Sequence, residues 1–140
     1  MKKLLKLVTM FFVLMSVTSL AYARNTEYMQ PIPQDVNSGP VKFYFGNQQH
    51  PRVVQNFGQY TTNPKSRSIG KSDARACNRA FQSALLSFQK RAQSLGANAV
   101  INIVNYYKKN PNSNNSAYEC HAGTWAAGVA LKGDVVKLAR

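Results

Sequence analysis

Few side chains in this sequence could take part in acid–base chemistry. Among the carboxylate and histidine side chains, only Glu119 and His121 stand two residues apart, a spacing that places both on one face of a strand. General acid–base catalysis needs such a pair in contact. We interpret the two as an ordinary exposed ion pair on a strand and expect no enzyme. A hydrolase that uses Glu119 and His121 is a third hypothesis. The carboxylates of the whole sequence are Glu27, Asp35, Asp73, Glu119 and Asp134.

Metal binding would require three or four converging ligands. The histidines and cysteines of the chain are His50, His121, Cys77 and Cys120. If the cysteines form a disulfide, two histidines remain on separate elements, so we expect no metal and no cofactor. The sequence also lacks a phosphate-binding loop of the Gly-x-x-x-x-Gly-Lys type.

The N-terminus has the pattern of a signal peptide. Lys2, Lys3 and Lys6 precede an apolar run from 7 to 17, which is too short to span a membrane, and Ala21-Tyr22-Ala23 fits a cleavage site. We expect residues 1–23 to be removed after Ala23 and the protein to be periplasmic. An uncleaved membrane anchor and secretion beyond the cell are the alternatives.

Export bears on the two cysteines. An even number of cysteines in an oxidising compartment favours a disulfide, here between Cys77 and Cys120. Two free thiols or a metal pair are the alternative.

The charge is strongly positive. The full chain has a formal net charge of +13, and loss of Lys2, Lys3 and Lys6 leaves 15 basic and 5 acidic residues, or +10. Such a chain favours anionic partners: lipopolysaccharide, nucleic acid or an acidic protein face. A solvated basic surface with no partner is the alternative. The sequence predicts a contact surface of basic residues in two loops: Lys65, Arg67, Lys71, Lys108 and Lys109.

The first part of the mature chain contains short elements. Residues 24–40 hold three prolines and almost no apolar periodicity, so they predict an extended tether. A peptide that becomes ordered on a partner is the alternative. Alternating apolar residues predict strands at 41–45 and 51–57, joined by a hairpin loop at 47–50. Residues 58–71 are polar and turn-rich and predict a long exposed loop.

The second part begins with the clearest element. Apolar residues recur every three or four positions from Cys77 to Leu95, which predicts a helix of about six turns with Ser72 or Asp73 as N-cap and Gly96 as C-cap. Strands are expected at 97–107, with alternate residues on opposite faces, and at 117–131, with a hairpin loop at 108–116 between them. A short last strand is expected at 134–138. Trp125 is expected to fill the core, and an exposed groove beside Ala126 and Ala127 is the alternative.

The order β-β-α-β-β predicts an α+β fold: a two-layer sandwich with a mainly antiparallel sheet and one long helix on one face. The domain organisation is a signal peptide at 1–23, a tether at 24–40 and a single domain at 41–140.

From Cys77 to Leu131 the chain resembles a small α+β family that includes the Rcs outer-membrane stress-sensor lipoprotein and the YbjQ-like domains. The shared short sequence segments are Ala97-Asn98-Ala99-Val100 after the helix and Gly128-Val129-Ala130-Leu131, with Cys120 eight residues before Gly128. The resemblance implies this fold, a bridge from Cys120 to Cys77, and a non-enzymatic role through protein contacts. The chain lacks the sensor's lipid-anchor cysteine and its second cysteine pair.

These observations lead to two main functional hypotheses. The first is a non-enzymatic interaction protein of the cell envelope, either an accessory or a stress sensor, with a protein partner. The second is a basic protein that binds the anionic groups of lipopolysaccharide or nucleic acid. Neither requires a small-molecule substrate, and the sequence leaves the oligomeric state open.

Overall fold

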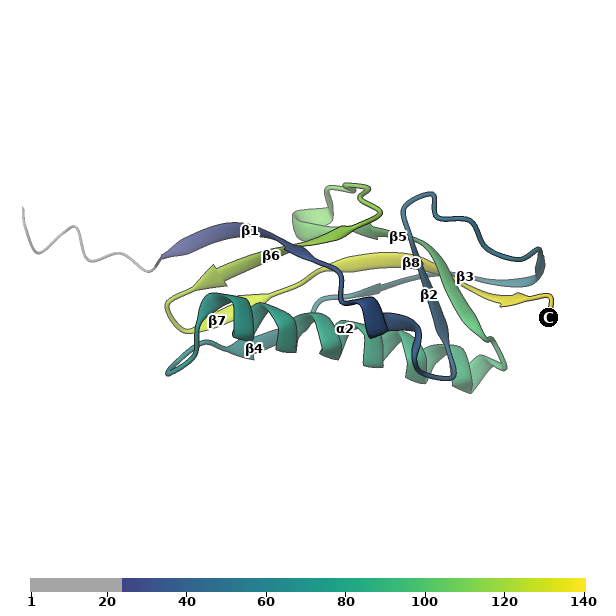
Figure 1. Ribbon diagram of the computed structural model, residues 1–140, viewed down its shortest axis with the longest axis horizontal. Coiled ribbons are helices and arrows are strands. Elements are labelled where there is room, and N and C mark those ends of the chain that lie inside the picture. Colours follow the sequence, from purple (N-terminus) through teal and green to yellow (C-terminus); the bar gives the residue numbers. More distant parts are fainter. Residues whose placement is uncertain (1–23) are drawn as a thin grey trace, which may run out of the picture.

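The computed structural model describes residues 24–140, so the predicted signal peptide lies outside the described residues. One long helix and eight strands make up this part of the chain, with two short 3-10 helices (Figure 1). In chain order they are β1 (Asn25–Pro31), η1 (Gln34–Asn37), β2 (Lys42–Phe45), β3 (Val53–Thr62), β4 (Lys65–Arg67), α2 (Asp73–Leu95), β5 (Ala99–Asn105), η2 (Tyr107–Lys109), β6 (Ala117–Gly123), β7 (Ala126–Gly128) and β8 (Leu131–Leu138).

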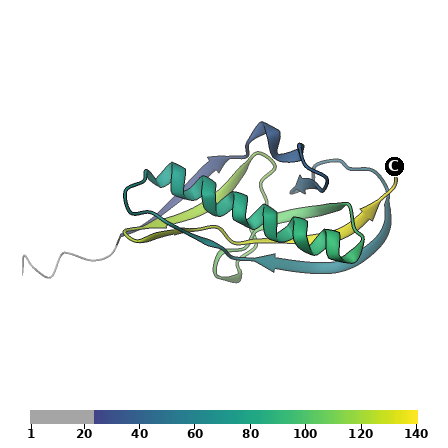
Figure 2. The same cartoon turned by 90° about the horizontal axis from the view of Figure 1, so that it is seen from below.

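The strands form two four-stranded sheets. Their orders are β1-β6-β7-β4 and β2-β5-β8-β3, and every pairing is antiparallel except the parallel pair β2–β5. Helix α2 contacts strands of both sheets and lies along one face of them (Figure 2). The predicted α+β class, with one long helix on one face of a mainly antiparallel layer, is therefore confirmed.

The helix begins and ends where its capping residues predict. The side chain of Ser72 accepts a hydrogen bond from the backbone N–H of Arg75, which satisfies one of the unpaired amides of the first turn. Gly96 adopts a left-handed conformation with φ of 75°, and its N–H bonds to the last carbonyls of the helix.

The core lies between α2 and the two sheets. Phe81 stacks on Tyr118 of β6 with ring centroids 4.0 Å apart, and four alanines of α2 are fully buried: Ala76, Ala80, Ala84 and Ala92. These small residues let the helix approach the strands closely. Cys77 and Cys120 are both fully buried and form a disulfide that joins α2 to β6.

The prediction of a tether at 24–40 is wrong for its first part. Residues 25–31 form β1, which pairs with β6 along its whole length from Asn25↔Gly123 to Pro31↔Ala117. Backbone hydrogen bonds hold this edge strand, so it needs little apolar periodicity. The folded domain therefore includes β1.

The predicted hairpin at 47–50 is also wrong. β2 pairs in parallel with β5, and β3 pairs with β8, so residues 47–50 connect two strands that are not neighbours. The predicted loop at 58–71 contains two strand segments, because β3 continues to Thr62 and β4 follows. Gly58 has a φ of 105° and lies where the pairing of β3 with β8 shifts register. The glycine is therefore part of an irregularity within β3 and does not end the strand as a turn would.

The alternation predicted for 97–107 breaks at Asn102. This residue has φ of 52°, and the pairing with β8 shifts register between Ile101 and Val104. As a result Val100 and Ile103, three positions apart, both enter the main core, whereas Ile101 packs in a smaller cluster on the other side.

The predictions for the C-terminal part need three changes. Residues 108–116 lead from one sheet to the other and are not a hairpin loop. The segment 117–131 is divided into β6, β7 and the first residue of β8, so the last strand starts at Leu131. Trp125 lies in the turn between β6 and β7 and is 67% exposed, so it does not fill the core.

Candidate anion-binding groove

A groove runs between strand β4 and the first half of α2. Its volume is about 450 Å³, and we call it the cationic groove. Strand β4 runs beside the helix because it pairs with β7 at the edge of its sheet, with Lys65 opposite Gly128 and Arg67 opposite Ala126. The residues that line the groove are Lys65, Ser66, Arg67, Lys71, Arg79, Gln82, Ser83 and Leu86.

The groove carries four cations, and no acidic side chain is among its lining residues. The pKa of Lys71 is lowered from its ordinary value, first because partial burial disfavours its charge. Repulsion adds to this effect, from Arg79, Arg75 and Arg67 in that order. Positive charge is therefore concentrated here without internal compensation, and an anion in the groove would relieve the repulsion.

The structure brings together three of the five predicted contact residues. Lys65, Arg67 and Lys71 all line the cationic groove. Lys108 lines a second cleft of about 320 Å³, and Lys65 lines this cleft as well. Lys109 lines neither cleft. Sequence reasoning missed Arg79. Its spacing of four from Arg75, on a helix that follows a basic loop, was the available signal.

Binding of single-stranded nucleic acid on a sheet uses aromatic rings on which bases can stack, and four tyrosines of residues 24–140 bear on this. Each of these four rings has a different partner. Tyr44 contacts His50 edge to face, Tyr60 lies under Arg91, Tyr106 lies under Lys132, and Tyr107 stacks on His121.

Glu119 and His121 lie on the face of β6 that points away from α2. His121 Nε2 is 2.6 Å from Glu119 Oε1, and the two side chains are only 12% and 11% exposed. Tyr107 covers the imidazole with ring centroids 3.3 Å apart. The side chain of buried Asn105 accepts a hydrogen bond from the backbone N–H of Glu119. The interpretation as an exposed ion pair is therefore wrong, because the pair is nearly buried.

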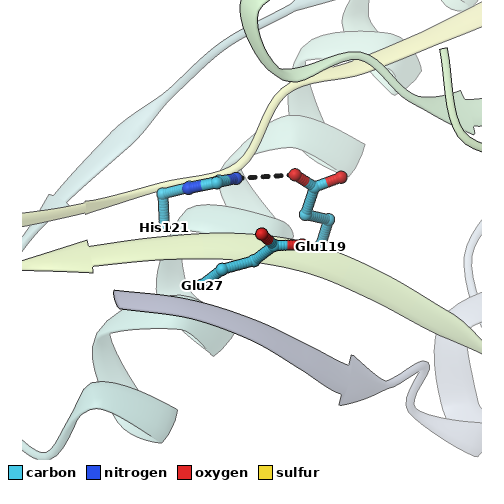
Figure 3. Close-up of side chains that lie close together, drawn as sticks. All are labelled: Glu27, Glu119 and His121. Carbon is cyan, nitrogen blue, oxygen red and sulfur yellow. Dashed lines mark hydrogen bonds and ion pairs between the residues drawn. The ribbon is translucent and has the colours of Figure 1, made fainter. Parts of the chain in front are cut away.

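Glu27 joins this pair from β1, directly opposite His121 in the ladder (Figure 3). The three side chains offer one nitrogen and two carboxylate oxygens that lie within 4.8 Å of one another. Such a set, completed by water, is suited to a divalent transition metal. Sequence reasoning placed Glu27 in the tether and missed this contact, because only the pairing of β1 with β6 creates it.

A third polar cluster fixes the start of the described chain to the helix. The guanidinium of Arg24 donates two hydrogen bonds to Asp73, at 2.5 and 2.9 Å, and the hydroxyl of Tyr28 donates a third at 2.7 Å. These bonds lower the pKa of Asp73 to about 2. Asp73 is the first residue of α2, where a negative charge also suits the helix dipole.

In comparisons with protein-family models, curated proteins and solved structures, nothing matches this chain. The resemblance to the stress-sensor family therefore stays a prediction. Within residues 24–140, no helix combines the length and apolar character needed to cross a membrane.

Proposed function

We propose that this protein is an exported, non-enzymatic protein of the bacterial cell envelope that binds phosphate-bearing groups in the cationic groove. The observation that carries the proposal is the concentration of Lys65, Arg67, Lys71 and Arg79 in one groove that no acidic side chain lines. Arginine forks and lysine ammonium groups are the side chains that bind phosphate oxygens best.

Two features support the cellular location. The predicted signal peptide would direct the chain across the inner membrane, with cleavage after Ala23. The buried Cys77–Cys120 disulfide suits the oxidising periplasm. Lipopolysaccharide and phospholipid phosphates are abundant there. Nucleic acid is a less suitable ligand, because each of the four tyrosine rings already contacts another side chain of the protein.

The test uses inorganic polyphosphate as a soluble probe, with affinity measured by calorimetry at two salt concentrations. Four phosphate contacts predict an affinity that falls about 50-fold between about 50 and about 200 mM salt. The triple variant Arg67→Gln, Lys71→Gln, Arg79→Gln should bind at least about tenfold more weakly, because each lost charge removes a favourable contact.

A matched control removes the same charge from other exposed sites: Arg52→Gln, Lys90→Gln and Arg140→Gln. This control should bind within about twofold of the parent protein. Equal losses in the two triple variants would mean that net charge alone attracts the probe, and the groove would not be the site.

The hypothesis of a protein partner remains the second candidate, because an acidic protein face would fit the same four cations. Photo-crosslinking in living cells from a probe at position 71 separates the two. Lipid or glycan adducts that disappear at high salt would support the phosphate proposal. One discrete protein adduct would favour an interaction module instead.

A further inference from the structure

Two loops meet at one end of the molecule, close to the start of the described chain. They are the connection from β4 to α2 and the turn between β6 and β7 (Figures 1 and 2). Ser68 joins them: its N–H bonds to the carbonyl of Trp125 at 3.0 Å, and its hydroxyl bonds to the carbonyl of Gly123 at 3.1 Å. Ser68 is only 6% exposed, so this link lies beneath the loop surface.

The two loops present large apolar side chains to solvent. Trp125 is 67% exposed and Ile69 is 54% exposed. Trp125 is the single tryptophan of the chain. Transfer of either side chain from water to an apolar environment would be favourable.

Basic residues flank the same surface. Arg67 and Lys71 stand two residues before and two residues after Ile69, and both line the cationic groove. The apolar tips are thus continuous with the proposed phosphate site. Tryptophan, an aliphatic residue and nearby cations are the combination that binds the headgroup region of anionic membranes.

The start of the described chain lies at this end as well. The backbone N–H of Arg24 bonds to the hydroxyl of Thr124 at 3.1 Å, next to Trp125, and its side chain is held by Asp73. The 23 preceding residues, predicted to be the apolar signal segment, therefore join the domain beside the two loops. Until the predicted cleavage after Ala23, a signal segment in the membrane would hold this end of the domain toward the bilayer.

We propose that this loop end, comprising Trp125, Ile69, Arg67 and Lys71, docks on the surface of an anionic lipid membrane. Trp125 and Ile69 enter the boundary between headgroups and acyl chains, and Arg67 and Lys71 contact lipid phosphates. This proposal rests on the proposed function and names the lipid headgroup as the source of the phosphate. A lipid surface fits better than a protein pocket, because the apolar groups stand on two tips beside the chain start and share their surface with unpaired cations.

The experiment follows the fluorescence of Trp125 in the exported, purified protein. Vesicles of phosphatidylglycerol mixed with phosphatidylcholine should shift the emission to shorter wavelength and protect Trp125 from acrylamide quenching. Vesicles of phosphatidylcholine alone should do neither. Each basic residue near an anionic surface raises binding about fivefold, so neutralising Arg67 and Lys71 together should lower binding about 25-fold.

The apolar contribution is tested by Ile69→Ser, whose matched control is Val54→Ser. Val54 is also 54% exposed but lies on β3, next to Val53, which pairs with Leu138 near the end of β8. Ile69→Ser should bind anionic vesicles about tenfold more weakly, whereas Val54→Ser should bind like the parent. Trp125→Ser, followed by vesicle sedimentation, should resemble Ile69→Ser.

Inorganic polyphosphate separates the two proposals. Ile69→Ser and Trp125→Ser should bind this soluble probe like the parent, which places their defect in lipid contact alone. A parent protein that binds polyphosphate but leaves Trp125 unshifted and fully quenchable on anionic vesicles would overturn membrane docking while the proposed function stands. Failure of the parent protein to bind polyphosphate would overturn both the phosphate-binding function and membrane docking.

Discussion

Replacing both bridge cysteines by alanine removes the only covalent link between α2 and β6 in the described chain. Cys77 and Cys120 are 43 residues apart, so the bridge closes a loop of about 44 residues in the unfolded chain. The chain-entropy model then gives a stabilisation of about 4 kcal/mol. Loss of two buried sulfur atoms adds about 1 kcal/mol each, so the total is about 4–6 kcal/mol.

This loss is large for a domain of this size, whose whole free energy of unfolding is about 5–15 kcal/mol. With an m-value of about 2 kcal/mol/M, the urea midpoint should fall by about 2 M or more. The m-value itself should rise, because an unfolded chain without the bridge exposes more surface.

The assay is urea denaturation followed by far-UV circular dichroism. The signal of the 23-residue helix α2 reports on the fold, whereas the exposed Trp125 would report poorly. The reduced parent protein is the control, since it keeps both sulfur atoms and isolates the loop entropy. A change below about 1 kcal/mol in both the reduced parent and the Cys77→Ala/Cys120→Ala variant would refute the bridge as a main support of the fold.

Three further predictions concern single residues. Folding lowers the pKa of Asp73 from about 3.8 to about 2, so its contribution to stability is present above the unfolded pKa and is lost as pH falls to about 2. The Asp73→Asn variant should therefore be less stable than the parent at pH 6 but equal to it near pH 2. Urea titrations at the two pH values measure this difference. Gly133→Ala should lower the free energy of unfolding by about 1–3 kcal/mol, because a Cβ there would lie 2.7 Å from Val100 Cγ1; an unchanged melting temperature would contradict this packing. Phe81→Ala should cost about 3–5 kcal/mol in the same assay, since Phe81 is fully buried, and a cost below 1 kcal/mol would place it outside the core.

The helix could be predicted from the sequence because its signals are local. Ser72 and Gly96 lie at its ends, and its buried residues recur at three- and four-residue steps. The disulfide could also be predicted, because the chain contains only two cysteines and an export signal pattern, so only one pairing was possible. The α+β class followed from the order of the elements.

The strand pairing could not be predicted because it depends on distant residues. β1 pairs with a strand about 90 residues later, and β2 pairs in parallel with β5 across the whole helix. Asn102 adds a local break in alternation, and the tolerance of asparagine for positive φ was its only signal in the sequence. The candidate site was also only partly predictable. The basic loop residues could be identified from the sequence, but Arg79 joins them only because α2 lies beside β4.

The central claim is that phosphate-bearing groups bind between β4 and the first half of α2. The most direct measurement is a map of backbone amide chemical shifts during titration with inorganic polyphosphate at low salt. We predict that the largest shifts occur at residues 65–71 and 79–86, which line or border the cationic groove. The contradicting result would be shifts centred on the cleft at the other end of the helix, where Tyr60, Lys90 and Arg91 lie.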